Sequence, residues 1–117
     1  MGKQAKNKIR KLLFVCRFNQ MRSRTAEQVF SAEKPYQVRS AGTDRFAERK
    51  VTGELILWAD VIFVMEDEQE EFIKEKFPDQ TRNKKIFLLD IPDNYCFMDP
   101  ELVGLIKDRV AYILEHN

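Results

Sequence analysis

The chain has 117 residues, enough for one domain with a substantial hydrophobic core and no crosslinks. With 44% hydrophobic and 33% charged residues the composition is that of an ordinary soluble protein, and the net charge of +1 gives no indication of nucleic-acid binding. The two cysteines, Cys16 and Cys96, form neither a disulfide framework nor a metal-ligand pattern, and the sequence contains no signal peptide or membrane span. We therefore expect a cytoplasmic protein that binds no membrane.

The N-terminal residues 1–8 contain three lysines and little apolar surface, so we expect a basic tail before a single domain of residues 9–117. Residues 12–15 follow as a short, wholly apolar run. Such a run is typical of a strand buried on both faces of a parallel sheet.

A helix is predicted from about Arg22, because Ala26, Val29 and Phe30 recur at helical spacing. The loop of residues 16–23 therefore connects the end of a buried strand to the first turn of a helix. The first amides of a helix have no internal partner, and its macrodipole favours negative charge. This loop is consequently predicted to bind an anion.

Three side chains of the loop carry the expected chemistry. Arg22 is able to hold two oxygens of a phosphoryl group in a bidentate fork. Cys16, near a helix N-terminus and a cation, is expected to be a thiolate, and Ser23 is expected to donate a hydrogen bond to it. The pattern indicates a nucleophile for phosphoryl transfer through a phosphocysteine. The alternative is that a cysteine at the end of a buried strand is simply a small apolar residue.

A second strand is predicted at residues 36–39, after the break at Pro35, and Gly42 is expected to allow a sharp turn. A strand, helix and strand in succession form a right-handed crossover, which places the two strands parallel and adjacent. Ser40 then either approaches the anion loop or serves the turn itself.

The middle of the chain predicts a short helix at residues 52–58 and a third buried strand at residues 61–64. The acidic run of residues 66–71 opens the next helix, where carboxylates favour the N-terminal end. We interpret this run as a solvated helix face and not as a metal site, since no histidine completes it.

The C-terminal part predicts a polar loop at residues 79–85 and a fourth strand at residues 86–89. A loop of residues 90–98 leads to the last helix, in which Asp99 is the N-cap and Pro100 the first helical residue. The expected inner stripe of this helix consists of Val103, Ile106, Val110, Ile113 and Leu114.

Four strands alternating with helices predict an α/β fold, a three-layer sandwich around a four-stranded parallel sheet in the order 2-1-3-4. In such sheets ligands bind beyond the carboxyl ends of the strands. That rule places the loop of residues 16–23, Ser40, Glu66 and Asp90 on one edge.

A family resemblance supports this interpretation. Residues 16–23, followed by Thr25-Ala26-Glu27, resemble the phosphate-binding loop of the low-molecular-weight protein tyrosine phosphatases. Residues 39–43 and 59–65 fit two further stretches of the family in order, and residues 88–93 fit its Asp-Pro acid loop. The resemblance covers nearly the whole chain after the basic tail.

Several positions depart from the family pattern. Phe18 stands where the family usually has glycine, Met21 where it often has a second cysteine, and Arg24 where proline is common. The connection between Thr43 and Trp58 is also shorter than in most members.

The resemblance implies a metal-independent, cofactor-free phosphomonoester hydrolase of the protein tyrosine phosphatase type, whose substrate is a phosphorylated protein or a small phosphomonoester. The expected phosphate-binding residues are Cys16, Arg17, Phe18, Asn19, Gln20, Met21, Arg22 and Ser23.

The general acid is expected to be Asp90, because it directly follows the fourth strand; Asp93, beyond Pro92, is the competing candidate. Tyr95 and Ser40 are expected at the rim of the substrate site.

Two other classes of function stay open. A thiol-dependent arsenate reductase would bind arsenate in the same loop and use Cys96 as a resolving thiol. A phosphate-binding or phosphoprotein-binding module would retain the loop without turnover, and the unusual Phe18 motivates that alternative.

Overall fold

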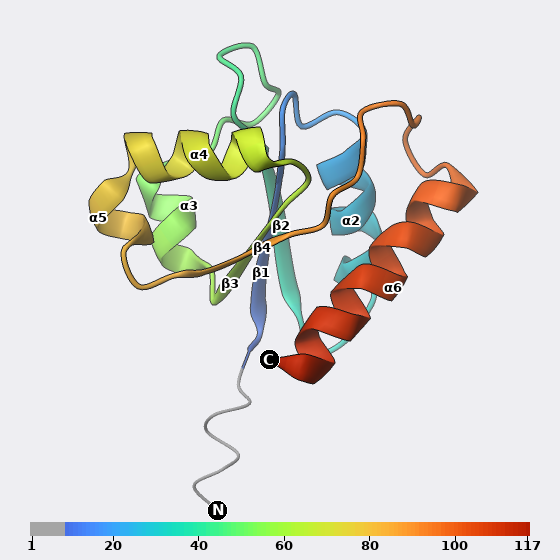
Figure 1. Ribbon diagram of the computed structural model, residues 1–117. Helices are drawn as coiled ribbons and strands as arrows, with labels where there is room; N and C mark the ends of the chain where they lie inside the picture. Colours follow the sequence, from blue (N-terminus) through green and yellow to red (C-terminus); the bar gives the residue numbers. More distant parts are fainter. Residues whose placement is uncertain (1–8) are drawn as a thin grey trace, which may run out of the picture.

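Helices and strands alternate along residues 9–117, the part of the chain that the computed structural model describes (Figure 1). The expected basic tail, residues 1–8, lies outside the described residues. The elements in chain order are β1 (Lys11–Cys16), α2 (Arg22–Ser31), β2 (Gln37–Gly42), α3 (Gly53–Trp58), β3 (Val61–Val64), α4 (Asp67–Lys76), α5 (Pro78–Thr81), β4 (Lys85–Leu88) and α6 (Pro100–His116).

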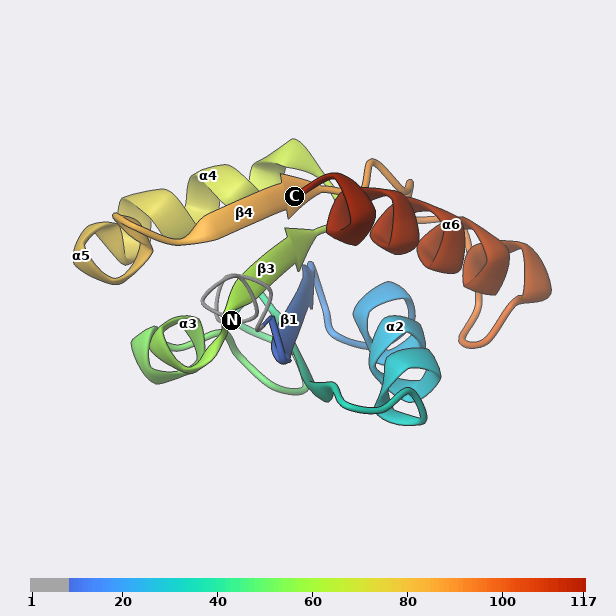
Figure 2. The same cartoon turned by 90° about the horizontal axis from the view of Figure 1, so that it is seen from below.

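The four strands form one parallel sheet in the order β2-β1-β3-β4, which confirms the predicted topology. Helices α2 and α6 cover one face of the sheet, and α3, α4 and α5 cover the other (Figures 1 and 2). The β1 strand is central and its last residue is Cys16, so the loop that follows it leaves from the middle of the sheet edge. Within residues 9–117, no helix combines the length and the hydrophobicity needed to cross a membrane.

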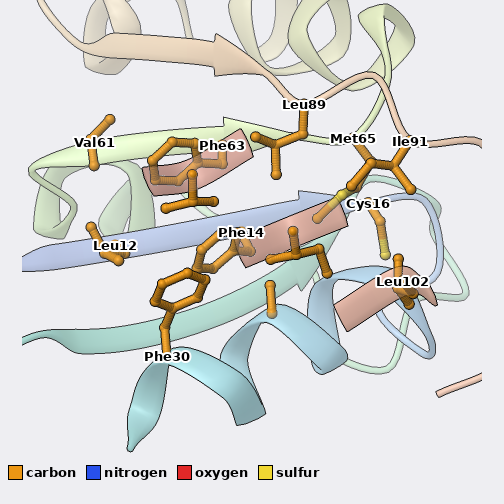
Figure 3. Packing of buried hydrophobic residues seen from close by; sticks show 13 residues of the cluster. Leu12, Phe14, Cys16, Phe30, Val61, Phe63, Met65, Leu89, Ile91 and Leu102 are labelled. Atoms are coloured by element: carbon orange, nitrogen blue, oxygen red, sulfur yellow. The ribbon is translucent and has the colours of Figure 1, made fainter. Parts of the chain in front are cut away.

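The apolar run of β1 supplies both hydrophobic cores because successive strand residues point to opposite faces. Leu12, Phe14 and Cys16 point toward α2 and α6, whereas Leu13 and Val15 point toward α3 and α4. Each is at most 2% exposed, and burying such a side chain contributes roughly 1.5–3 kcal/mol to stability. Cys16 therefore ends a fully packed row of side chains, as Figure 3 shows.

Aromatic stacking fixes the position of α2 on this face. The ring of Phe14 stacks on Phe30 of α2, with centroids 5.7 Å apart, and on Phe63 of β3 at 5.1 Å (Figure 3). Offset aromatic pairs of this kind add about 0.5–1.5 kcal/mol beyond their buried area. The C-terminal half of α2 is thereby held against the middle of β1.

Some predicted boundaries were wrong. The second strand extends to Gly42, beyond the expected residues 36–39, because Ser40 and Ala41 are buried and pair with the end of β1. The predicted polar loop at residues 79–85 begins with the short helix α5, and β4 starts and ends one residue before the predicted strand.

The start of α6 agrees with its prediction. The Asp99 side chain accepts a hydrogen bond from the Glu101 N–H at 2.9 Å, and Pro100 occupies the first turn. Leu102, and not the expected Val103, is fully buried there together with Ile106 and Val110.

Gly42 is required for close approach and not for the sharp turn that the sequence predicts, since no glycine among the described residues has a positive φ. A Cβ atom at this position would lie 2.6 Å from the Arg17 carbonyl oxygen and 2.7 Å from the Ala47 Cβ. The absence of a side chain therefore allows β2 to lie directly against the loop that follows Cys16.

Substitution of Gly42 tests this packing. Gly42→Ala should lower the free energy of unfolding by about 1–3 kcal/mol, because the new methyl group meets backbone that cannot move freely. Gly104→Ala in α6 is the matched control: its Cβ would have nothing within 4 Å, so we expect a gain of roughly 0.5–1 kcal/mol. Urea denaturation measures both values, and equal effects of the two changes would contradict the close approach.

Candidate active site

The loop between β1 and α2 turns back over the Cys16 sulfur. Asn19 has φ 58°, a left-handed conformation that asparagine tolerates better than most residues. This turn directs the Asn19 backbone N–H to the Cys16 Sγ at 3.2 Å. A backbone donor aimed at sulfur is placed to hold negative charge that develops there.

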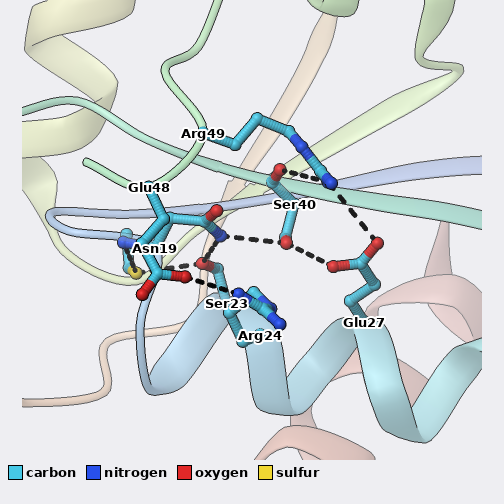
Figure 4. A network of polar contacts seen from close by, with 8 residues as sticks. Asn19, Ser23, Arg24, Glu27, Ser40, Glu48 and Arg49 are labelled. Carbon is cyan, nitrogen blue, oxygen red and sulfur yellow. Dashed lines mark hydrogen bonds and ion pairs between the residues drawn. The ribbon is translucent and has the colours of Figure 1, made fainter.

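A chain of buried hydrogen bonds leads from Cys16 to a carboxylate (Figure 4). The Ser40 hydroxyl lies 2.5 Å from Glu27 Oε1 and donates to it, because a carboxylate only accepts. Asn19 Nδ2 donates to Ser40 Oγ at 2.9 Å and to Ser23 Oγ at 2.8 Å. The Ser23 hydroxyl hydrogen is then free to point to the Cys16 Sγ, 3.0 Å away. Glu27 thus sets the direction of the whole chain.

The segment of residues 43–50 binds the outer side of the loop. Its backbone N–H groups at Thr43, Asp44 and Glu48 donate to the carbonyl oxygens of three consecutive loop residues. These bonds join Thr43 to Cys16 at 3.0 Å, Asp44 to Arg17 at 2.9 Å and Glu48 to Phe18 at 3.1 Å. The three carbonyl groups are therefore directed away from the site. Inside the site, their oxygens would repel an anion.

Arg22 is 2% exposed and is enclosed by acceptors from two other strand ends. Its Nη1 donates to the Ile91 carbonyl oxygen at 2.7 Å and lies 3.0 Å from Glu66 Oε1. Its Nε lies 3.6 Å from Asp93 Oδ1. A buried cation is tolerated when it is paired in this way, and the pairing fixes the plane of the guanidinium group.

Glu66 was expected on the ligand-binding edge, but the sequence did not predict its contact with Arg22. It follows β3 and caps α4, where its side chain and that of Gln69 bond each other's backbone N–H groups. The signal for it was its position, since an acid directly after a buried strand lies on the ligand-binding edge. The acidic run thus contains one residue that faces the site.

A cleft of about 320 Å³ opens above Cys16 and Arg22. One wall belongs to the β1–α2 loop and the other to the loop between β4 and α6. The lining residues are Cys16, Phe18, Gln20, Met21, Arg22, Asp93, Asn94, Tyr95 and Cys96.

The two candidate acids lie in different places. Asp93 lines the cleft, whereas Asp90 is exposed outside it, with a φ of 59° and its carbonyl oxygen bound by Arg109 at 2.7 Å. Asp90 lies beyond the end of β4 in a left-handed turn, and its neighbours Leu89 and Ile91 are buried. Its side chain is therefore left on the outside of the molecule.

The two expected rim residues also differ. Tyr95 lines the cleft, and its hydroxyl donates to Glu101 at 3.1 Å. Desolvation and this bond raise the pKa of Tyr95 above its ordinary value, so its ring stays neutral. Ser40 is fully buried beneath the loop and does not line the cleft.

The positions of the other loop residues vary as well. Phe18, Gln20 and Met21 face the cleft, whereas Arg17 is directed to Asp44, 3.5 Å away. Asn19 is 1% exposed and supports the loop from within.

This order of parallel strands, with a loop that leads from the end of the central strand into a helix, is the fold of the low-molecular-weight protein tyrosine phosphatases. Vibrio vulnificus Wzb in complex with benzylphosphonate is similar with a TM-score of 0.72 and 23% identity, over 93% of this chain and 99% of that one. The low-molecular-weight protein tyrosine phosphatase SP-PTP from Streptococcus pyogenes is similar with a TM-score of 0.74 and 19% identity, over 92% and 93%. The YwlE arginine phosphatase from Geobacillus stearothermophilus is similar with a TM-score of 0.66 and 24% identity, over 92% and 94%.

At the level of sequence, no family model and no curated protein matches the chain. The likeness therefore concerns the fold, and the chemistry of the site is argued from its own residues.

The reactivity of Cys16 tests the geometry around its sulfur. In a Cys96→Ser background, iodoacetamide should alkylate Cys16 readily at neutral pH, because the Asn19 N–H and the Ser23 hydroxyl face its sulfur. Ser23→Ala should slow this alkylation several-fold, and inorganic phosphate should protect the sulfur. A rate no faster than that of the exposed Cys96 in a Cys16→Ser background would show an ordinary thiol.

Proposed function

We propose that the chain is a cysteine-dependent phosphomonoester hydrolase of the protein tyrosine phosphatase type, acting through a phosphocysteine. The observation that carries the proposal is the Cys16 sulfur, which faces the Asn19 N–H and the Ser23 hydroxyl in a cleft that it shares with the buried Arg22. A polarised sulfur and a fixed cation in one cleft suit attack on a phosphoryl group.

In the first step the Cys16 thiolate attacks phosphorus, and the S–P bond forms as the P–O bond to the leaving group breaks. Arg22 and the loop amides stabilise the charge on the equatorial oxygens. Asp93 donates its proton to the leaving oxygen, so the alcohol departs neutral.

In the second step the Asp93 carboxylate takes a proton from water, and the water oxygen attacks phosphorus. The P–S bond breaks, inorganic phosphate leaves and the thiolate is regenerated. The Ser23 hydroxyl and the Asn19 N–H, at 3.0 Å and 3.2 Å from the sulfur, stabilise this leaving thiolate.

We propose Asp93 as the general acid, in place of Asp90, which the sequence favours. Asp93 lines the cleft and lies 3.6 Å from the Arg22 guanidinium, whereas Asp90 lies outside the cleft. Asp93 is also half exposed, so the proton that it donates is readily replaced from solvent.

The walls of the cleft favour an aromatic phosphomonoester. Phe18 and Tyr95 line it from opposite loops, and two aromatic rings beside a phosphate site suit a flat side chain such as that of phosphotyrosine. Among the similar structures are both tyrosine phosphatases and an arginine phosphatase, so phosphoarginine is the substrate to compare directly.

Loss of the nucleophile and of the arginine fork should each abolish most of the activity. With p-nitrophenyl phosphate, Cys16→Ser should leave no turnover, and Arg22→Lys should reduce kcat by roughly two or more decades because the bidentate contact is lost. Arg17→Lys is the control, since Arg17 is directed to Asp44 and should retain near-normal kcat. Near-normal turnover of Arg22→Lys would place the phosphate elsewhere.

The identity of the general acid is tested by varying the leaving group of the substrate. Asp93→Asn should slow a poor leaving group such as an alkyl phosphate by roughly 10²–10⁴-fold and an activated aryl phosphate far less. Asp90→Asn is the matched control and should show no such dependence on the leaving-group pKa. The reverse pattern would return the assignment to Asp90.

Arsenate reduction is the second candidate, because Cys96 lines the same cleft as Cys16. In that reaction Cys16 binds arsenate through sulfur, and Cys96 attacks that sulfur to form a disulfide. Two electrons pass to arsenic, arsenite leaves, and thioredoxin or a small thiol reduces the disulfide. Arsenite formation that stops in Cys96→Ser, together with inert aryl phosphates, would favour this reaction over phosphatase activity.

A further inference from the structure

A second, smaller hollow lies on the other side of the β2 end from the catalytic loop. Its volume is about 150 Å³, below the roughly 300–1,000 Å³ of pockets for drug-sized ligands, so it suits a small group. The lining residues are Gly42, Thr43, Arg45, Lys50, Val51, Phe72 and Lys76. We call this hollow the basic pocket, since three of its residues are cations and none is an acid.

The acids of the segment of residues 43–50 lie on one side of it. On the side of the catalytic loop and α2, Asp44 pairs with Arg17 at 3.5 Å, and Glu48 pairs with Arg24 at 2.6 Å. The acids of the segment are thus already occupied, and they do not neutralise the cations on the other side.

The three cations of the basic pocket have no ion pair among the described residues. Arg45 lies over the ring of Phe46, 4.8 Å from its centroid, and Lys76 lies 5.6 Å from that of Phe72. Lys74, on the same helix as Lys76, does pair, with Glu70 at 2.7 Å. In a chain with a net charge of only +1, three unpaired cations around one hollow are a local excess of positive charge.

An apolar wall of the basic pocket strengthens the effect of these charges. Val51 is 7% exposed and Phe72 is partly buried, so one wall is apolar and holds little water. Charge interactions beside a low-dielectric wall are stronger than in open solvent. Arg45 further offers a planar fork that matches an oxyanion with two N–H donors.

We propose that the basic pocket is a second oxyanion site, separate from the catalytic cleft, which binds one phosphate or carboxylate group. The group belongs either to a free small anion or to an acidic side chain of a bound protein substrate. Both sources share the same recognition by Arg45, Lys50 and Lys76.

The position of the basic pocket connects it to the catalytic loop. Gly42 and Thr43 line the pocket, and the Thr43 N–H donates to the Cys16 carbonyl oxygen at 3.0 Å. Gly42 itself lies against the backbone of Arg17 and Asn19. An occupant therefore contacts the same strand end that supports the catalytic loop.

A titration of the full chain with inorganic phosphate, followed by amide chemical shifts, tests the site. Two groups of amides should shift: those around Thr43, Val51 and Lys76 in the basic pocket, and those of residues 17–22 in the catalytic loop. The double variant Lys50→Gln, Lys76→Gln should weaken binding at the first group by roughly tenfold or more and leave the second unchanged. Loss of the shifts at residues 17–22 alone would show that the catalytic loop binds no phosphate, and loss of turnover alone would leave both groups of shifts in place, so failure of the proposed function is distinguishable from failure of this site.

Two controls separate specific binding from a general charge effect. Lys74→Gln removes one positive charge from α4 but lies outside the basic pocket, so it should leave both groups of shifts unchanged. The double variant Lys50→Arg, Lys76→Arg should retain binding. An equal loss in Lys74→Gln, or absence of any shift around Thr43 and Lys76 in the wild type, would overturn the proposal.

The source of the anion is distinguished by kinetics. For an occupant on the substrate, Lys50→Gln, Lys76→Gln should lower kcat/KM several-fold for a phosphotyrosine peptide with neighbouring acids, but not for p-nitrophenyl phosphate. For a free anion, kcat/KM should be unchanged for both substrates while phosphate binding at the basic pocket is lost. If the double variant keeps kcat/KM for both substrates and also binds phosphate at the basic pocket with undiminished affinity, the proposal is contradicted.

Discussion

The buried chain of hydrogen bonds from Glu27 to Cys16 is the constraint on which the site depends. Among the described residues no buried side-chain polar atom lacks a partner, and leaving one unpaired would cost about 1–3 kcal/mol. The carboxylate at one end only accepts, so the donors along the chain are assigned in turn, and the Ser23 hydroxyl hydrogen is left for the sulfur. The folded state thus fixes the polarity around Cys16 before any substrate arrives.

The buried Arg22 imposes the second constraint. A guanidinium group at 2% exposure requires opposite charge nearby, and Glu66 and Asp93 supply it from the ends of two different segments. Because the strands are parallel, their carboxyl ends meet at one edge and bring these acids together. The same acids limit the motion of the guanidinium group, so a phosphoryl group meets an arginine that is already oriented.

The segment of residues 43–50 connects the catalytic cleft to the basic pocket. Its backbone holds three carbonyl groups of the catalytic loop, while its acids pair with Arg17 and Arg24. Gly42 makes this contact close enough, because any side chain there would meet the Arg17 carbonyl. This segment therefore supports the backbone of residues 16–18 and keeps its acids paired away from the basic pocket.

The sequence by itself determined the topology and the central loop, because both follow from local patterns. The wholly apolar residues 12–15 and 61–64 specified buried parallel strands, and the helical spacing after residue 22 placed the loop of residues 16–23 between a strand and a helix. Only the tertiary structure decided which acid faces the cleft, that Ser40 lies beneath the loop, and that Glu66 holds Arg22. These outcomes depend on which way a side chain points at a strand end and on contacts between segments far apart in the chain, and no local pattern specifies either.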